Sequence, residues 1–225
     1  MHEALARAER EGAAPGAEFR FATARQPFRR PRAGGDPVSL LIALSAALFV
    51  AIGAWHAADA AYLHAKAWLG QQLLLDAWHK SGTLDGAVKP WPWADTHPVA
   101  RLVVPAHGIE LLVLAGANGR TLAWGPGHVE STASPGTAGN AVVTAHRDTH
   151  FAFLRNLVAG DRIVVETAAR SMRSYRVERT LVADHRALRL PADDRATTLS
   201  LVTCYPFDAI DPGTPLRYAV IARGE

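Results

Sequence analysis

A long apolar run near the N-terminus constrains this chain more than any other stretch. Val38–Trp55 is dominated by Ala, Leu, Ile, Val and Phe, and no Asp, Glu, Lys or Arg stands between Asp36 and Asp59. A helix of about 20 residues crosses the roughly 30 Å hydrocarbon core of a bilayer, so the run is long enough to span one. A cleaved signal peptide and a buried helix of a soluble protein are the alternatives. The length of the run and of the arm before it favours a retained transmembrane helix over residues 37–56.

The distribution of charge predicts the orientation of this helix. Residues 1–36 are rich in Ala, Gly, Arg and Pro, and we expect them to be a disordered arm. Residues 1–35 hold seven Arg against four Glu. Basic segments stay on the cytoplasmic side of the membrane, so the arm is predicted to be cytoplasmic and the rest of the chain to lie outside the cytoplasm. Residues 90–225 are nearly neutral, with fourteen Arg and thirteen acids, which argues against a nucleic-acid-binding face.

Residues 57–96 combine a helical pattern with a rigid segment. A mostly apolar stripe predicts a helix over residues 57–80 that packs against the following domain and ends at Ser81-Gly82. Lys89–Asp95 contains two prolines, which exclude a helix there. We interpret Trp91 and Trp93 as core or interface anchors, with a substrate groove as the alternative. The stripe consists of Leu63, Ala67, Leu69, Leu73, Leu74, Ala77 and Trp78.

Residues 97–225 read as one mainly β domain. Short β-like runs alternate with Gly, Pro and Asn, and one short helix is expected over Thr149–Val158. Seven or eight short strands with one helical insertion predict a closed or nearly closed β-barrel. The runs are Val99–Pro105, Ile109–Leu114, Ala141–Ala145, Asp161–Thr167, Ser174–Asp184, Thr198–Cys204 and Leu216–Ala222.

Three chemically capable side chains end or open strands in this pattern. Cys204, the single cysteine of the chain, closes one run, His146 follows another, and Arg217 opens a third. A lone cysteine is often a small core residue, but a thiol beside a base can act as a nucleophile. His146 can serve as that base, and Arg217, always protonated, can donate to an oxyanion. His146 and His150 have the i,i+4 spacing of a zinc pair, but no HExxH pattern accompanies them, and we predict no metal.

The stretches around these residues resemble the motifs of the sortase family. Gly139–Phe151 is similar to the sortase histidine motif, and Ser200–Cys204 resembles the TLxTC cysteine motif, with Ser200 in place of the usual Thr. Leu216-Arg217-Tyr218 resembles the strand that brings the arginine of sortases. The resemblance covers roughly residues 97–223. The anchor, the Lys89–Asp95 segment and the residues after Cys204 resemble the Gram-negative branch of the family, called class GN.

The resemblance implies an eight-stranded sortase barrel and a cysteine transpeptidase. Cys204 would attack an LPxTG-like C-terminal sorting signal of a substrate protein and form a thioacyl-enzyme. His146 would protonate the departing amine, and Arg217 would steady the oxyanion or the peptide backbone. Thr203, Thr144, His150 and Tyr205 are expected to contact substrate.

No cofactor is expected, and the partners are the substrate protein, an amine-bearing acceptor and the inner membrane, with the catalytic domain in the periplasm. A cysteine endopeptidase that releases its product to water and a non-catalytic scaffold barrel at the membrane are the alternatives.

Overall fold

The computed structural model describes residues 36–82, 86–211 and 213–225, so the predicted disordered arm lies outside the described residues except for Asp36. Two compact units divide the chain, Met1–Ile52 and Gly53–Glu225. Helix α1 (Pro37–Ser81) is one continuous helix of 45 residues, without a break at residue 56. Within the described ranges α1 is the one helix long and apolar enough to cross a membrane, and its apolar window is wholly unburied. This is the feature expected of a single membrane anchor.

The last turns of α1 pack against the rest of the second unit, as predicted, but over a narrower stripe. Gly70, Leu74, Ala77 and Trp78 are buried, whereas Leu63 and Leu69 are more than half exposed. The spacing of four, three and one residues keeps the buried side chains on one helix face. The helix ends at Ser81, directly before Gly82 as the sequence predicted.

Two side chains from the barrel bind the end of α1. The indole of Trp124 lies against Gly70, leaving no room for a side chain there, and Gln71 Nε2 donates to Trp124 O over 2.8 Å. Arg170 donates to the carbonyls of Trp78 and His79, over 2.8 and 3.2 Å. Its guanidinium also lies 4.7 Å from the centre of the Trp78 ring. Arg170 thus satisfies carbonyl groups that the last turn of any helix leaves without intrahelical partners.

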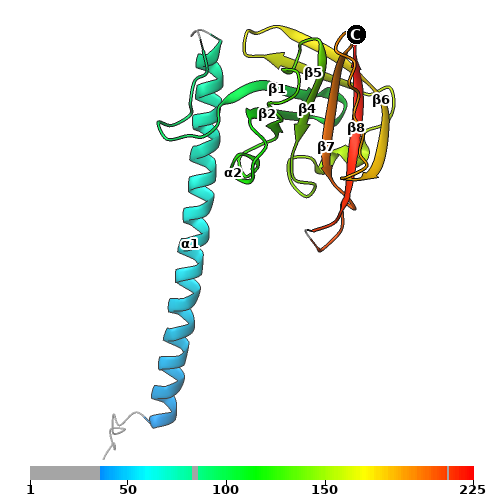
Figure 1. Cartoon of the computed structure of the whole chain (residues 1–225). Coiled ribbons are helices and arrows are strands. Elements are labelled where there is room, and N and C mark those ends of the chain that lie inside the picture. The colour runs from blue at the N-terminus through cyan, green and yellow to red at the C-terminus, as the bar shows by residue number, and fades with distance from the viewer. Residues whose placement is uncertain (1–35, 83–85, 212) are drawn as a thin grey trace, which may run out of the picture. The chain divides into compact units, whose positions relative to one another are not determined.

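Eight strands close into a barrel in the order β1-β2-β3-β4-β7-β8-β6-β5 (Figure 1). The pairs β2–β3 and β4–β7 are parallel and the other six are antiparallel. Closure leaves no open sheet edge, which removes the unpaired backbone groups that an edge strand exposes. The strands are β1 (Pro98–Val104), β2 (Ile109–Ala115), β3 (Gly127–His128), β4 (Gly139–Thr144), β5 (Arg162–Thr167), β6 (Met172–Asp184), β7 (Thr197–Cys204) and β8 (Leu216–Gly224).

Seven of these strands match the predicted runs, and β3 was not predicted. The predicted helix over residues 149–158 is the 3₁₀ helix η2 (Ala152–Asn156), and two further short helices are η1 (Pro105–His107) and α2 (Gly119–Leu122). The barrel interior is filled with apolar side chains, among them Leu102, Phe151, Leu154, Leu199 and Leu201. A filled interior leaves no internal cavity for chemistry, so reactive groups must lie on the outside of the barrel or at its rim.

Candidate active site

Alternation along β7 and β8 places two of the three predicted catalytic residues on one face. Successive side chains of a strand point to opposite faces of the sheet. In β7, Leu199 and Leu201 belong to the interior cluster and Val202 to a second, outer cluster. Cys204 has the parity of Val202 and therefore points outward. The same count on β8 gives Arg217 the parity of the outer residue Ala219, whereas His146 lies just beyond the end of β4.

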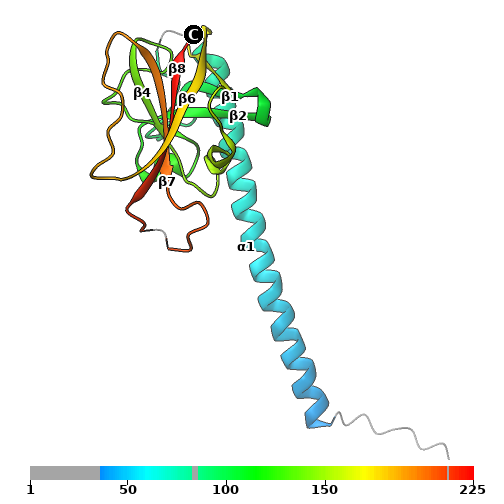
Figure 2. The ribbon, with the colours of Figure 1, turned by 90° about the vertical axis from the view of Figure 1, so that its right-hand side faces the viewer.

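The register of the strands then brings Cys204 and Arg217 to the same level. Cys204 and Arg217 are direct partners in the antiparallel pair β7–β8. Thr144 is the partner of Val202 in the parallel pair β4–β7. Beyond the strand, Ala145 N donates to Val202 O over 3.4 Å, and His146 follows two residues after the end of β4. Figure 2 shows β4, β7 and β8 from the side on which their ribbons can be followed together. His146 is exposed and the thiol of Cys204 is half-buried and free.

The guanidinium of Arg217 is already held by backbone oxygens. Its Nη1 donates to Thr214 O over 2.8 Å and to Leu216 O over 2.9 Å. Arginine has five N–H donors in a planar fork, and both of these contacts use the same nitrogen. These two contacts hold the guanidinium of the residue that pairs with Cys204.

Thr203, which was expected to contact substrate, points into the barrel. It is 1% exposed, and its Oγ1 donates to Ala145 O over 2.7 Å. This hydrogen bond ties the end of β7 to the residue before His146, so Thr203 supports the site from within. Thr144, by contrast, has outward parity and is half-buried beside Val202, where it can meet a bound ligand.

Tyr205 lies in an aromatic group directly after Cys204. Its ring stacks on that of Tyr218 at a centroid distance of 6.1 Å, and both rings also contact Phe207. Arg155, from η2, lies 4.9 Å from the centre of the Phe207 ring. These contacts pack the start of the β7–β8 segment against neighbouring elements, close to the predicted nucleophile.

His150 lies four residues after His146, and its side chain lines a cavity that His146 does not line. Its ring lines a cavity of about 310 Å³ together with Gln71, Leu111 and Trp124. The Nδ1 atom is buried without a hydrogen-bond partner. Burial lowers the pKa of His150 from its ordinary value, and the charge of nearby His146 lowers it further. His150 therefore favours the neutral form, which a half-buried imidazole adopts to avoid desolvating a charge.

A covered apolar strip lies beside Cys204 on the outer face of β4 and β7. Val142 and Val202 are 9% and 8% exposed, and Leu188 and Leu190, from the segment between β6 and β7, pack on their cluster. Asn140 holds this segment, because its Nδ2 donates to Pro191 O over 3.1 Å. Ser200, the departure from the cysteine motif, donates to Asn140 Oδ1 over 2.8 Å. The small hydroxyl at position 200 therefore has a defined structural partner.

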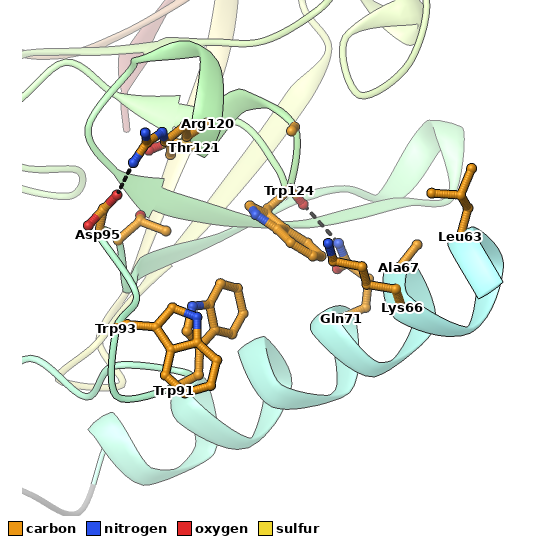
Figure 3. A pocket seen from close by; sticks show the side chains of 12 residues that line it. Leu63, Lys66, Ala67, Gln71, Trp91, Trp93, Asp95, Arg120, Thr121 and Trp124 are labelled. Carbon is orange, nitrogen blue, oxygen red and sulfur yellow. Dashed lines mark hydrogen bonds and ion pairs between the residues drawn. The ribbon is translucent and has the colours of Figure 1, made fainter. Parts of the chain in front are cut away.

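The tryptophan-rich segment before the barrel lines a separate cavity. Figure 3 shows Trp91, Trp93 and Trp124 with Gln71 of α1. These residues line a cavity of about 570 Å³. Trp91 packs against Trp124 at a centroid distance of 5.2 Å, as an anchor would, whereas Trp93 is 80% exposed. None of the three predicted catalytic residues lines this cavity.

The sequence did not single out Arg147, Arg155 or Asn140 as functional. Each holds a segment that borders the site, and no local pattern distinguishes them from other polar residues. In the described ranges, no group of three or more His, Cys, Asp or Glu side chains gathers at metal-binding distance.

An exposed histidine, a half-buried free thiol and a hydrogen-bonded guanidinium come from neighbouring segments of a closed barrel, and these are groups that cysteine-dependent acyl transfer uses. The chain belongs to the sortase family, because the model of the Sortase domain matches residues 102–225. Sortases are cysteine transpeptidases.

Individual relatives share the fold over part of their length. Sortase D of Bacillus subtilis is 27% identical over 123 residues, which are 54% of this chain and 61% of that protein. Sortase A from Corynebacterium diphtheriae superposes with a TM-score of 0.53 and 24% identity over 59% of this chain and 63% of that one. A Sortase D5 transpeptidase of Clostridium perfringens superposes with a TM-score of 0.57 and 21% identity, over 70% of this chain and 98% of that one. The chain thus spans less than two thirds of the Sortase D and Sortase A relatives.

Proposed function

We propose that this protein is a membrane-anchored cysteine transpeptidase that cleaves a C-terminal sorting signal of LPxTG type and transfers the acyl part to an amine. The observation that carries the proposal is the direct register of Cys204 with Arg217 on β7 and β8, together with His146 directly after β4, the strand that pairs with β7. A nucleophile, a base and a cationic donor are the groups that acyl transfer requires.

In the first half of the reaction the Cys204 thiol loses its proton to His146, and Sγ attacks the carbonyl carbon of the scissile peptide. The Arg217 guanidinium stabilises the negative charge that develops on the carbonyl oxygen. When the C–N bond breaks, His146 returns the proton to the leaving amine, and a thioester remains on Cys204. In the second half His146 takes a proton from the incoming amine, whose nitrogen forms the new amide bond. The thiol of Cys204 is then restored.

The acyl donor is proposed to lie beside Cys204 along the segment that covers the outer face of β4 and β7. Val142 and Val202 are buried under this segment, whereas its Leu188 and Leu190 stay half-buried. Their outer side suits the aliphatic residue that opens an LPxTG-like signal, because fully burying a leucine side chain contributes about 2 kcal/mol. Thr144 and Tyr205, beside the apolar strip and beside Cys204, are retained as proposed substrate contacts.

The location and the acceptor also belong to the proposal. As in class GN sortases of Gram-negative organisms, helix α1 would hold the enzyme in the inner membrane, with the catalytic domain in the periplasm. The acceptor would be an amine of peptidoglycan, of a protein or of a small molecule.

The test is a transfer assay on the full-length protein in detergent micelles. A fluorescent LPxTG-like peptide is incubated with and without an added amine, and the products are weighed by mass spectrometry. Transfer to the amine supports the proposal, and water as the only acceptor would indicate the endopeptidase. Cys204→Ala and His146→Ala should lose activity by about a thousandfold or more, since residues that act as a unit fail together. His64→Ala, an exposed histidine on α1, is the matched control; full activity in the two site variants would sink the proposal.

A further inference from the structure

Arg147, the residue after His146, is buried but makes no ion pair among the described residues. Arg147 is 8% exposed, and an arginine stays charged in proteins. Its fork donates to three oxygens, none of which belongs to a carboxylate. They are Thr214 Oγ1 at 3.1 Å, Ala209 O at 2.7 Å and Asp211 O at 2.8 Å. A buried charge satisfied in this way is costly to lose, because its partners are left without a donor.

All three partners lie in the segment that connects Cys204 with Arg217. Ala209 and Asp211 lie in its middle, and Thr214 lies three residues before Arg217. Phe207, near the start of the segment, packs against the core, but Ile210 in its middle is fully exposed. Contacts from Arg147 therefore hold its middle and its end against the residues that follow β4, while the Arg155–Phe207 contact holds its start.

Thr214 joins two guanidinium groups. Its hydroxyl accepts from Nη1 of Arg147, and its carbonyl accepts from Nη1 of Arg217. One residue thereby links the arginine next to His146 with the arginine opposite Cys204. The two cations repel each other. The hydroxyl and carbonyl oxygens of Thr214, which accept one hydrogen bond from each guanidinium, therefore help to fix their positions. We call the contacts of Arg147 with Ala209, Asp211 and Thr214 the arginine clip.

We infer that Arg147 is a positioning residue for acyl transfer. Through the arginine clip it fixes the Cys204–Arg217 segment relative to His146, and through Thr214 it sets the direction of the Arg217 guanidinium. This inference rests on the proposed function. It predicts that loss of the clip harms the chemical step, because Arg217 would leave the place where the oxyanion forms.

The experiment compares full-length Arg147→Met, Arg147→Lys and Thr214→Val with two matched controls, Thr214→Ser and Arg223→Met. Arg223 is an exposed arginine at the opposite end of β8 from Arg217. The kinetic readouts are kcat and KM in the peptide transfer assay. Hydrogen exchange of the backbone amides of residues 205–211 and 213–216, followed by mass spectrometry, reports the segment directly.

Arg147→Met is expected to lower kcat by about tenfold or more and to speed exchange in the segment. Arg147→Lys should not restore kcat, since one ammonium group cannot replace the planar guanidinium fork. Thr214→Val should lower kcat by a smaller factor and Thr214→Ser should not. Combining Arg147→Met with Thr214→Val should cost less than the product of the single losses, because both remove the same link. Thr214→Val also keeps the backbone contacts, so it tests the link if Arg147→Met does not fold.

Two outcomes separate this inference from the proposed function. A lower melting temperature with unchanged kcat in the folded variants, or unchanged exchange in the segment, overturns the positioning role. An inactive wild type overturns the transpeptidase proposal instead, and the exchange measurement still decides whether the clip holds the segment.

Discussion

Replacing Thr203 with Val tests how the site is supported from inside the barrel. The two side chains have nearly the same shape, so the change removes one hydroxyl and leaves the packing volume in place. Thr203 is 1% exposed and Ala145 is 4% exposed. Without the Thr203 hydroxyl, the Ala145 carbonyl loses the 2.7 Å hydrogen bond that ties β7 to the residue before His146.

The expected loss of stability follows from the burial of both partners. A buried acceptor left without its donor costs about 1–3 kcal/mol in the free energy of unfolding. For a domain of this size each kcal/mol corresponds to roughly 3–6 °C in melting temperature. Transfer activity should fall further than this, by about tenfold, because displacing catalytic groups by even 1 Å is costly.

The measurement is a pair of curves on full-length Thr203→Val: thermal unfolding followed by circular dichroism, and transfer rate at a temperature well below unfolding. Thr203→Ser is the matched control, since it keeps the hydroxyl and loses only a methyl group. Its activity should stay near that of the wild type. If Thr203→Val unfolds at the wild-type temperature and transfers at the wild-type rate, the hydrogen bond to Ala145 supports neither the fold nor the site.

Two further predictions concern the contact of α1 with the barrel. Gly70→Leu should lower the melting temperature and raise the protease susceptibility of residues 86–95, because the new side chain would meet the Trp124 ring; unchanged values would contradict this contact. Burial raises the pKa of Glu166, but hydrogen bonds from Arg170 and Arg101 outweigh it, so its pKa is lowered overall. A lowered folded-state pKa gives stability above the unfolded pKa that is lost as the pH falls through the folded value. The Glu166→Gln variant should therefore lose less stability than the wild type between pH 6 and 3, roughly the range around the ordinary Glu pKa. Denaturant titration at each pH measures the free energy of unfolding, and equal losses would refute the role of this carboxylate.

The sequence was sufficient to place the strands around the candidate site because their signals are local. Apolar runs of β type end at His146 and Cys204 and begin with Arg217, and these boundaries agree with β4, β7 and β8 within two residues. Strand β3 has only two residues, Gly127 and His128, and its sequence carries no apolar run. Its pairing with β2 and β4 depends on barrel closure, which no local pattern shows.

The orientation of Thr203 could not be predicted because β7 is covered on both faces. Its six central residues are all buried, since the interior cluster lies on one side and the segment with Leu188 and Leu190 on the other. A strand buried on both faces reads as a continuous apolar run without alternation. Only the two separate clusters show which residues point inward. Together with the alternation of the strand, they place the Thr203 side chain inside the barrel and the Cys204 side chain outside it.

Helix α1 could also be predicted from the sequence. We expected a transmembrane helix over residues 37–56 and a helical continuation over residues 57–80, and both lie in α1. The backbone continues to Ser81 because no Pro or Gly pair interrupts the helix before Ser81-Gly82. Lipid and water favour different side chains on the helix surface, but the backbone hydrogen bonds of the helix are the same in both.

Specificity in this enzyme is expected to reside in two connecting segments, whereas reactivity resides in strand ends. The filled barrel interior forces the reactive groups outward, and strand register fixes their level. Neither determines which peptide fits, and we expect the segments between β6 and β7 and between β7 and β8, which border the site, to select it. Each segment is held by a residue of or next to β4, Asn140 in one case and Arg147 in the other. Substitutions at Asn140 should therefore change peptide selection, whereas substitutions at Arg147 should also lower kcat, because the segment that Arg147 holds contains Thr214, which contacts Arg217.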